Sequence, residues 1–349
     1  MKKDDEFMAY IAGLMDGDGS FSIIKEKRSR GYVYSPCIQL SNVFKEMPML
    51  LFNNFGGSFK EKSKQKHQKK VQYVWNVRGF SSCKSFLNKV KNFLVLKKER
   101  AFLLNEFIGK FSTDYEREIG KDGRFLPRDI TDKGQSVYHM KLQCMNNDCL
   151  TNEFKLVKQT SKNSEDTIFW SYLAGILDTE GSFSIKKEKP SCGSRNFRYG
   201  TVIQLSMATI EVMNFIRKNI CIGRICFPTA KTCQRGFCFK MSFNKVSECH
   251  FLISKVIPFL LFKKPAATMI LEFCENYEVV KHCRNGIPKE EIEYRESIYQ
   301  KVIQFNKYGY DKPSLIDSET LKQGYEGQAG NTMQAERLSE RDTKVCATV

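Results

Sequence analysis

The chain has 349 residues, of which 41% are hydrophobic and 27% are charged. This composition excludes collagen-like, coiled-coil and wholly disordered proteins, and the length is typical of two folded lobes with connections. There are 56 basic residues against 39 acidic residues, and the formal net charge of +17 favours a polyanionic partner, either a nucleic acid or an anionic membrane surface.

Residues 1–111 predict a first lobe that begins with a helix. Apolar residues recur at helical spacing from Phe7 to Met15, and Gly17 and Gly19 are expected to end the helix. Alternating apolar and polar residues then predict strands, each with one face toward the core and one polar, basic face toward solvent. The expected order is strands at 20–28 and 34–42, a helix at 46–55, strands at 58–66 and 70–78, and helices at 81–94 and 97–111.

The pattern returns in residues 168–310, which predict a second lobe. The segment Tyr10–Ile23, YIAGLMDGDGSFSI, is repeated as Tyr172–Ile185, YLAGILDTEGSFSI, with nine of fourteen positions identical. A repeat of this length predicts two lobes of the same architecture. Shorter matches are Ile38–Ser41 with Ile203–Ser206 and Asn92–Lys98 with Pro258–Lys264.

Two further segments differ from the lobes in composition. Residues 112–167 form an unusually long connection, of the kind that is either disordered or functional, and the polar tail at 311–349 is expected to be disordered. These segments carry net charges of −1 and −2, which leaves +20 on the two lobes. The sequence therefore predicts a charged folded surface rather than a polybasic tail.

The chain contains no apolar stretch of the roughly 20 residues that span a bilayer, so no membrane partner is expected. Its first residues do not resemble a signal peptide, and 13 cysteines without a CxxC pair favour reduced thiols in a protein that is not secreted. The 40 lysines, 16 arginines and 27 phenylalanines are compatible with an AT-rich organellar gene, and we expect a mitochondrion in preference to a chloroplast.

The repeated segments contain IAGLMDGDG at Ile11–Gly19 and LAGILDTEG at Leu173–Gly181. They resemble the two motifs of single-chain LAGLIDADG homing endonucleases, and the resemblance covers about 7–111 and 169–282. It implies an α+β fold with two pseudo-symmetric αββαββα lobes, each with a curved antiparallel four-stranded sheet, joined by the packed motif helices. It also implies a monomer, because two unequal lobes in one chain match an asymmetric target without a partner.

The motif residues predict a site at the lobe junction. Gly13 and Gly175 remove side-chain bulk, so the two helices can approach closely and bring their ends together. Asp18 and Glu180 would then repel each other by a few kcal/mol at roughly 4–6 Å, unless a proton or cation relieves the repulsion. Mg²⁺ or another divalent cation fits this demand, because it prefers oxygen ligands and often takes one or two carboxylates.

The resemblance assigns further roles to matching positions. It implies that Asp18 and Glu180 bind the metal together with the backbone carbonyls of Gly17 and Thr179. Asp16 and Asp178, at the sixth motif position, are expected to cap or brace the helix ends.

Glutamines and lysines are also expected at this site. Gln39 and Gln204 are similar to residues that order water, and Lys97 and Lys263 are similar to lysines that offset charge on the attacked phosphate. An alternative interpretation fits equally well. In it, each glutamine is one more strand residue that contacts a base, and each Lys-Lys pair is the solvent-exposed start of a helix. Lys98 and Lys264 are alternatives for the catalytic lysines.

The polar strand faces are expected to bind DNA. Two strands of nine residues span about 60 Å end to end, which corresponds to about 18 base pairs. The sheets would lie in the major groove, with the acids facing the backbones across the minor groove. The predicted contacts are Ser22, Ile24, Glu26, Arg28, Ser41, Lys60, Lys62, Lys64, Gln72, Ser184, Lys186, Glu188, Arg195, Arg198, Ser206, Arg224 and Lys240.

Three functions fit these features. The leading hypothesis is a site-specific homing endonuclease that makes a metal-dependent double-strand break in DNA. The main alternative is an intron maturase that binds its own intron RNA to assist splicing, with or without DNA cleavage. A catalytically silent DNA-binding regulator is less favoured, because it has no need for two acids at the junction.

Overall fold

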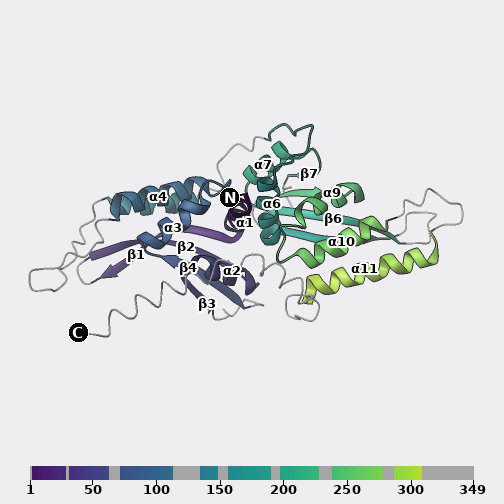
Figure 1. Cartoon of the computed structure of the whole chain (residues 1–349), viewed down its shortest axis with the longest axis horizontal. Coiled ribbons are helices and arrows are strands. Elements are labelled where there is room, and N and C mark those ends of the chain that lie inside the picture. The colour runs from purple at the N-terminus through teal and green to yellow at the C-terminus, as the bar shows by residue number, and fades with distance from the viewer. Residues whose placement is uncertain are drawn as a thin grey trace, which may run out of the picture.

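The computed structural model has two lobes, with α1 (Lys2–Asp18) and α6 (Thr167–Glu180) packed against each other between them (Figure 1). Each lobe places helices on one face of a four-stranded sheet. The residues described are 2–28, 31–62, 71–112, 134–147, 156–189, 197–227, 238–277 and 287–308. The expected tail at 311–349 and the predicted contacts Lys64 and Arg195 lie outside them.

The first lobe follows the predicted order of elements. All its neighbouring strands are antiparallel, and the sheet order is β1-β2-β4-β3. After α1, the elements are β1 (Gly19–Arg28), β2 (Gly31–Asn42), α2 (Glu46–Phe55), β3 (Ser58–Lys62), β4 (Gln72–Arg78), α3 (Phe80–Val90) and α4 (Lys98–Phe111).

The second lobe repeats this arrangement with the sheet order β5-β6-β8-β7. The predicted α+β class with two antiparallel four-stranded sheets is therefore confirmed. After α6, the elements are β5 (Gly181–Glu188), β6 (Arg198–Met207), α7 (Glu211–Asn219), β7 (Arg224–Cys226), β8 (Phe239–Phe243), α9 (Val246–Val256) and α10 (Lys264–Glu275).

Alternation along the strands separates the core from the open sheet face. In β1, Phe21 and Ile23 are buried, whereas Ser20 is exposed and Ser22 is only partly covered. The buried face packs against the helices, and its largest fully buried side chain is Trp75 of β4. The opposite faces of both sheets therefore carry the polar and basic residues.

A helix beyond the predicted set packs on each lobe. In the segment expected to connect the lobes, α5 (Gln135–Asn147) packs on α4 and β1, and in the second lobe α11 (Lys289–Tyr308) packs on α10 and β5. Because β1 and β5 are edge strands, these helices cover edges that would otherwise be open. The carbonyl of Phe183 in β5 accepts a hydrogen bond of 2.9 Å from Asn306.

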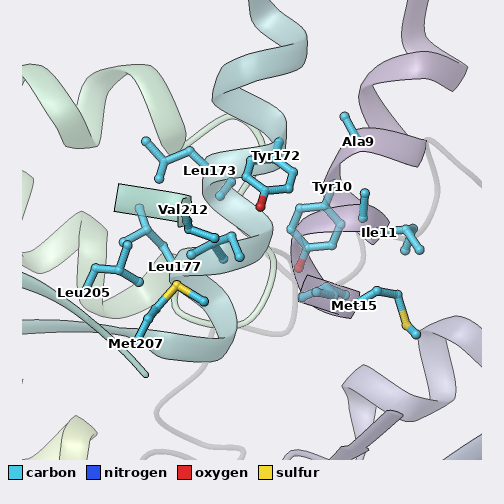
Figure 2. Packing of buried hydrophobic residues seen from close by; sticks show 14 of the residues in the cluster. Ala9, Tyr10, Ile11, Met15, Tyr172, Leu173, Leu177, Leu205, Met207 and Val212 are labelled. Carbon is cyan, nitrogen blue, oxygen red and sulfur yellow. The ribbon is translucent and has the colours of Figure 1, made fainter. Parts of the chain in front are cut away.

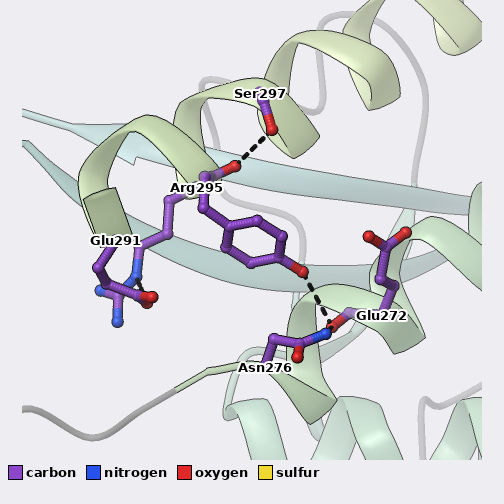
Figure 3. Close-up of polar contacts among 6 residues, drawn as sticks. Glu272, Asn276, Glu291, Arg295 and Ser297 are labelled. Atoms are coloured by element: carbon purple, nitrogen blue, oxygen red, sulfur yellow. Dashed lines mark hydrogen bonds and ion pairs between the residues drawn. The ribbon is translucent and has the colours of Figure 1, made fainter. Parts of the chain in front are cut away.

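Polar contacts fasten α11 to α10 (Figure 3). The hydroxyl of Tyr294 donates to the carbonyl oxygen of Glu272 at 3.4 Å. Arg295 is buried, pairs with Glu291 one turn earlier, and places its guanidinium carbon 4.3 Å from the ring centroid of Tyr277. Among the described residues, none of the helices is long and apolar enough to cross a membrane.

Some predicted boundaries are wrong. The helix expected at 81–94 ends at Val90. Helix α1 continues through Gly17 and ends at Asp18, directly before Gly19, so only the second of the two expected glycines follows the helix. A β-carbon on Gly17 would overlap the side chain of Thr179 on α6. This glycine is therefore needed for the contact between helices, not for ending one of them.

Candidate active site at the junction of the two lobes

Helices α1 and α6 cross at a pair of glycines, and Figure 2 shows the buried side chains packed around this crossing. A β-carbon on Gly13 would lie 2.9 Å from the backbone nitrogen of Ile176, and one on Gly175 would lie 3.0 Å from that of Leu14. Both distances are too short for a side chain, so only glycine lets the two backbones approach this closely. The crossing therefore brings the C-terminal ends of both helices to one place.

Asp16 is fully buried and holds the loop between α3 and α4. Its carboxylate accepts hydrogen bonds from the backbone N–H groups of Val95, Leu96 and Lys97 at 2.7, 3.0 and 2.8 Å. The hydroxyl of Tyr172, on the opposite motif helix, donates a fourth hydrogen bond at 2.8 Å. These donors provide the partners that a buried carboxylate requires.

Asp178 makes the equivalent contacts in the second lobe. It accepts from the backbone N–H groups of Leu261, Phe262 and Lys263 at 2.9, 3.3 and 2.7 Å, and from the hydroxyl of Tyr10 at 2.7 Å. Burial raises the pKa of this carboxyl group, and the hydrogen bonds lower it in part. The prediction that the sixth-position acids brace the helix ends is confirmed.

Lys97 reaches from the loop between α3 and α4 to the end of α1. Its Nζ donates to the carbonyl oxygens of Met15, Gly17 and Gly19 at 2.9, 2.8 and 2.7 Å. The ammonium group thus satisfies carbonyls at the end of the helix and at the start of β1. Burial lowers the pKa of Lys97 to about 8, and the charge of Asp16 partly offsets this effect.

Lys263 occupies the same position in the second lobe. Its Nζ donates to the carbonyl oxygens of Leu177, Thr179 and Gly181 at 3.0, 3.0 and 2.6 Å. Burial lowers its pKa, and the nearby carboxylates partly offset the shift. By contrast Lys98, the alternative to Lys97, is exposed and places its Nζ 6.0 Å from the centroid of an aromatic ring on its own helix.

Asp18 and Glu180 are the last residues of α1 and α6, and they interact electrostatically across the junction. Burial raises the pKa of Asp18, while a hydrogen bond of 2.6 Å from the Asn42 amide and the charges of both lysines, Lys97 and Lys263, lower it. Burial also raises the pKa of Glu180, and the charge of Asp18 raises it further. The negative ends of two helix dipoles add to this repulsion.

The two motif carboxylates at this junction fit a divalent cation. Burial and mutual repulsion disfavour their charged forms, and Mg²⁺ would neutralise these charges. Mg²⁺ needs no further protein side chain. Among the described residues, no group of three or more His, Cys, Asp and Glu side chains could hold a metal, so a zinc-type cage is not found there. The carbonyls of Gly17 and Thr179, also expected as ligands, accept the lysine hydrogen bonds.

The predicted glutamines lie on the open sheet faces near the helix ends. Gln39 pairs with Ser20, and Gln204 pairs with Ser182, which are the strand residues two positions after the motif acids. Each side-chain amide donates to a serine hydroxyl on the same face, at 3.0 and 3.3 Å. Both glutamines therefore border the junction from the exposed side.

The described members of the predicted DNA-contact set lie on the open faces of the two sheets. Arg28 donates to Glu26 at 2.6 Å, so this pair shares its charges locally. The set comprises Ser22, Ile24, Glu26 and Arg28 on β1, Ser41 on β2, Lys60 and Lys62 on β3, Gln72 on β4, Ser184, Lys186 and Glu188 on β5, Arg198 and Ser206 on β6, Arg224 on β7 and Lys240 on β8.

Three residues at the site were not predicted from the sequence. Tyr10 and Tyr172 donate across the junction, and Asn42 donates to one of the two motif acids. The identity of Tyr10 and Tyr172 at the first position of the repeated segment was a signal, because tyrosine in the same place of both repeats suggests a shared contact. No comparable signal marked Asn42, because Met207 stands at the matching position of the second lobe.

Comparison with known proteins finds a matching family model and a similar curated protein. The model of the LAGLIDADG endonuclease family matches residues 11–107. "Probable intron-encoded endonuclease aI3" of Debaryomyces hansenii is 25% identical over 241 residues, which is 64% of this chain and 34% of that protein. The chain thus spans about a third of the length of this relative.

Solved structures share the fold. I-SmaMI, bound to an uncleaved DNA target in the presence of calcium ions, aligns with a TM-score of 0.56 at 14% identity, over 85% of this chain and 98% of that one. The I-LtrWI LAGLIDADG homing endonuclease, bound to target DNA, aligns with a TM-score of 0.58 at 14% identity and the same coverage. Residues 11–107 thus match the LAGLIDADG endonuclease family, and the chain has the two-lobed fold of the solved LAGLIDADG homing endonucleases.

Proposed function

We propose that this chain is a site-specific homing endonuclease that hydrolyses both strands of a long, asymmetric DNA duplex with the help of a divalent cation. The observation that carries the proposal is the cluster of Asp18, Glu180, Lys97 and Lys263 between the open faces of two sheets. Each lobe contributes one acid and one lysine, so the cluster matches a reaction that is carried out twice, once on each strand.

Each residue of the cluster has a distinct task in this proposal. Asp18 and Glu180 would hold the cations, which supply a nucleophilic water and stabilise the leaving oxygen when they are bound. Lys97 and Lys263 place fixed positive charge beside the attacked phosphates, where negative charge increases in the transition state. Gln39 and Gln204 would each orient a water molecule from the open sheet face.

The open sheet faces would hold the DNA. Their lysines and arginines neutralise phosphates or contact bases, and the two faces together match about 18 base pairs. The solved structures of I-SmaMI and I-LtrWI were determined with DNA bound, which supports DNA as the partner of this fold. Because both lobes are present in one chain, we propose that it acts as a monomer.

We also propose an intron-encoded origin in an organelle, with a mitochondrion favoured. The support is the lysine-rich composition together with the relative named as an intron-encoded endonuclease.

The proposal is tested by cleavage of a randomised duplex library with Mg²⁺, followed by sequencing of the new ends. We expect a recurring site of about 18 base pairs, cut on both strands. Glu180→Gln should abolish cleavage of the selected site while binding persists. A wild-type chain that binds its own intron RNA but cuts no duplex would overturn the proposal in favour of the maturase alternative.

A further inference from the structure

Two hydrogen bonds cross the junction in opposite directions. Tyr172 of the second lobe donates to Asp16 of the first at 2.8 Å, and Tyr10 of the first lobe donates to Asp178 of the second at 2.7 Å. Both tyrosines and both aspartates are buried, and Figure 2 shows the tyrosines side by side between α1 and α6. Neither bond is part of the predicted metal or DNA contacts.

Each bond is the first link of a continuous set of contacts that ends beside a motif acid. From Tyr172, the contacts run through Asp16 to the backbone N–H groups of residues 95–97. They continue through the Nζ of Lys97 to the carbonyl oxygens around Asp18. The equivalent contacts run from Tyr10 through Asp178 and the loop at 261–263 to Lys263.

We infer that Tyr10 and Tyr172 are positioning residues that act on the opposite lobe, so that each tyrosine holds the lysine loop that serves one strand of the duplex. The inference rests on the proposed endonuclease function. A rotation that relates the two lobes also relates the two strands of a duplex lying across them. The half-site of Asp18 and Lys97 therefore serves one strand, and that of Glu180 and Lys263 serves the other.

Tyr172 remains a hydrogen-bond donor at working pH. Burial and the charge of Asp16 raise the pKa of Tyr172 well above its usual value, so the phenol keeps its proton. Removing the hydroxyl leaves Asp16 with the backbone donors alone and loosens one loop while the other loop keeps its tyrosine. Such asymmetry separates a positioning effect from a general loss of folding, which would affect both strands equally.

The experiment uses the full-length chain, its selected target labelled on either strand, and the variants Tyr172→Phe and Tyr10→Phe. We expect each variant to change the ratio of the two strand-cleavage rates by about tenfold, in opposite directions, with little change in KM. Amide hydrogen exchange without DNA gives an independent measurement. Exchange should increase at 95–97 in Tyr172→Phe and at 261–263 in Tyr10→Phe.

Tyr138→Phe is the matched control, because the hydroxyl of Tyr138 also donates to a carboxylate, that of Glu106 at 2.6 Å, but lies on α5. This control should leave the strand ratio unchanged. Equal slowing of both strands, or faster exchange in the tyrosine's own lobe, would overturn the inference while leaving the endonuclease function intact. If the wild-type chain cuts neither strand, the endonuclease function and its strand assignment both fail, whatever the exchange data show.

Discussion

Gly13 and Gly175 face each other so closely that a β-carbon on Gly13 would lie 3.0 Å from the Cα of Gly175. The same β-carbon would overlap the carbonyl oxygen of Tyr172, which belongs to a helix backbone and cannot move aside cheaply. We therefore predict that Gly13→Ala and Gly175→Ala each lower the free energy of unfolding by about 1–3 kcal/mol or more. Denaturant titration of each variant measures the effect.

The control for this prediction is Gly109→Ala on α4. A β-carbon on Gly109 would meet no atom within 4 Å, and the residue is exposed within a helix. Alanine should stabilise the chain there by up to about 1 kcal/mol, because glycine is a poor helix former. If alanine is equally harmless at Gly13, the helix crossing is not as tight as described.

The motif acids should make stability depend on pH when no divalent cation is present. Burial raises the pKa of both Asp18 and Glu180 in the folded chain. The folded chain therefore keeps Asp18 and Glu180 protonated to higher pH than the unfolded chain does. The stability that this protonation provides is lost as pH rises from the ordinary carboxyl pKa through the raised pKa. Glu180→Gln should thus gain stability over wild type as pH rises from about 4, the ordinary carboxyl pKa, through the raised pKa of Glu180.

Thermal unfolding at several pH values in a chelating buffer checks this prediction. The difference between the variant and wild type is the quantity to follow, because other carboxyl groups titrate in both proteins. An advantage of Glu180→Gln that shrinks as pH rises would contradict the burial of this side chain.

A divalent cation should offset the destabilisation caused by the buried, mutually repelling carboxylates of Asp18 and Glu180. Binding to the folded chain alone stabilises it by about 2.7 kcal/mol at a cation concentration one hundred times the dissociation constant. We predict this stabilisation for wild type and its loss in the double variant Asp18→Asn, Glu180→Gln. Unfolding measured across a Ca²⁺ or Mg²⁺ titration is the assay, and equal stabilisation of both proteins would place the cation elsewhere.

Lys97 and Lys98 provide a matched pair of lysines. Lys97→Met would leave three carbonyl groups, at the end of α1 and the start of β1, without their ammonium donor. We expect a loss of about 1–3 kcal/mol in unfolding free energy together with a large loss of cleavage. Lys98→Met, at an exposed position, should stay within about 0.5 kcal/mol of wild type and cut normally. If Lys98→Met abolishes cleavage and Lys97→Met does not, Lys98 is the lysine that serves the active site.

The sheet lysines should contribute to DNA binding through the salt dependence of affinity. Lys62 and Lys240 are exposed on the open faces of the two sheets. Replacing either with alanine should reduce the slope of log affinity against log salt by about 1. Lys255→Ala, on α9 behind the sheet, is the control and should leave the slope unchanged. An effect of the same size in Lys255→Ala would indicate that the DNA binds on the helical face of the lobe.

Much of the fold follows from local pattern. Helix α2 has the predicted bounds, Glu46–Phe55, because an acidic first turn, an apolar face and a following Gly-Gly pair all agree. Strand faces were predicted because alternation is strict where one side is buried, as at Phe21 and Ile23. The repeated motif placed Asp18 and Glu180 at one junction.

The remaining features depend on contacts that are distant in sequence. Helix α5 was not expected, because polar residues interrupt its apolar ones and it becomes stable by packing on α4 and the edge strand β1. The direction of Lys97 could not be read from a Lys-Lys pair, since it depends on the loop that Asp16 holds. The bond from Tyr172 to Asp16 joins residues 156 positions apart, and no local pattern encodes it.

The crossed tyrosines bear on how such chains can be recombined. Because the lysine loop of either lobe relies on a hydroxyl supplied by the other, neither half is a self-sufficient module. A chimaera built by exchanging one lobe for that of a relative would inherit a complete set of contacts only if the incoming helix also carries tyrosine at the matching place. New target specificity assembled from halves is therefore constrained at a position far from any base.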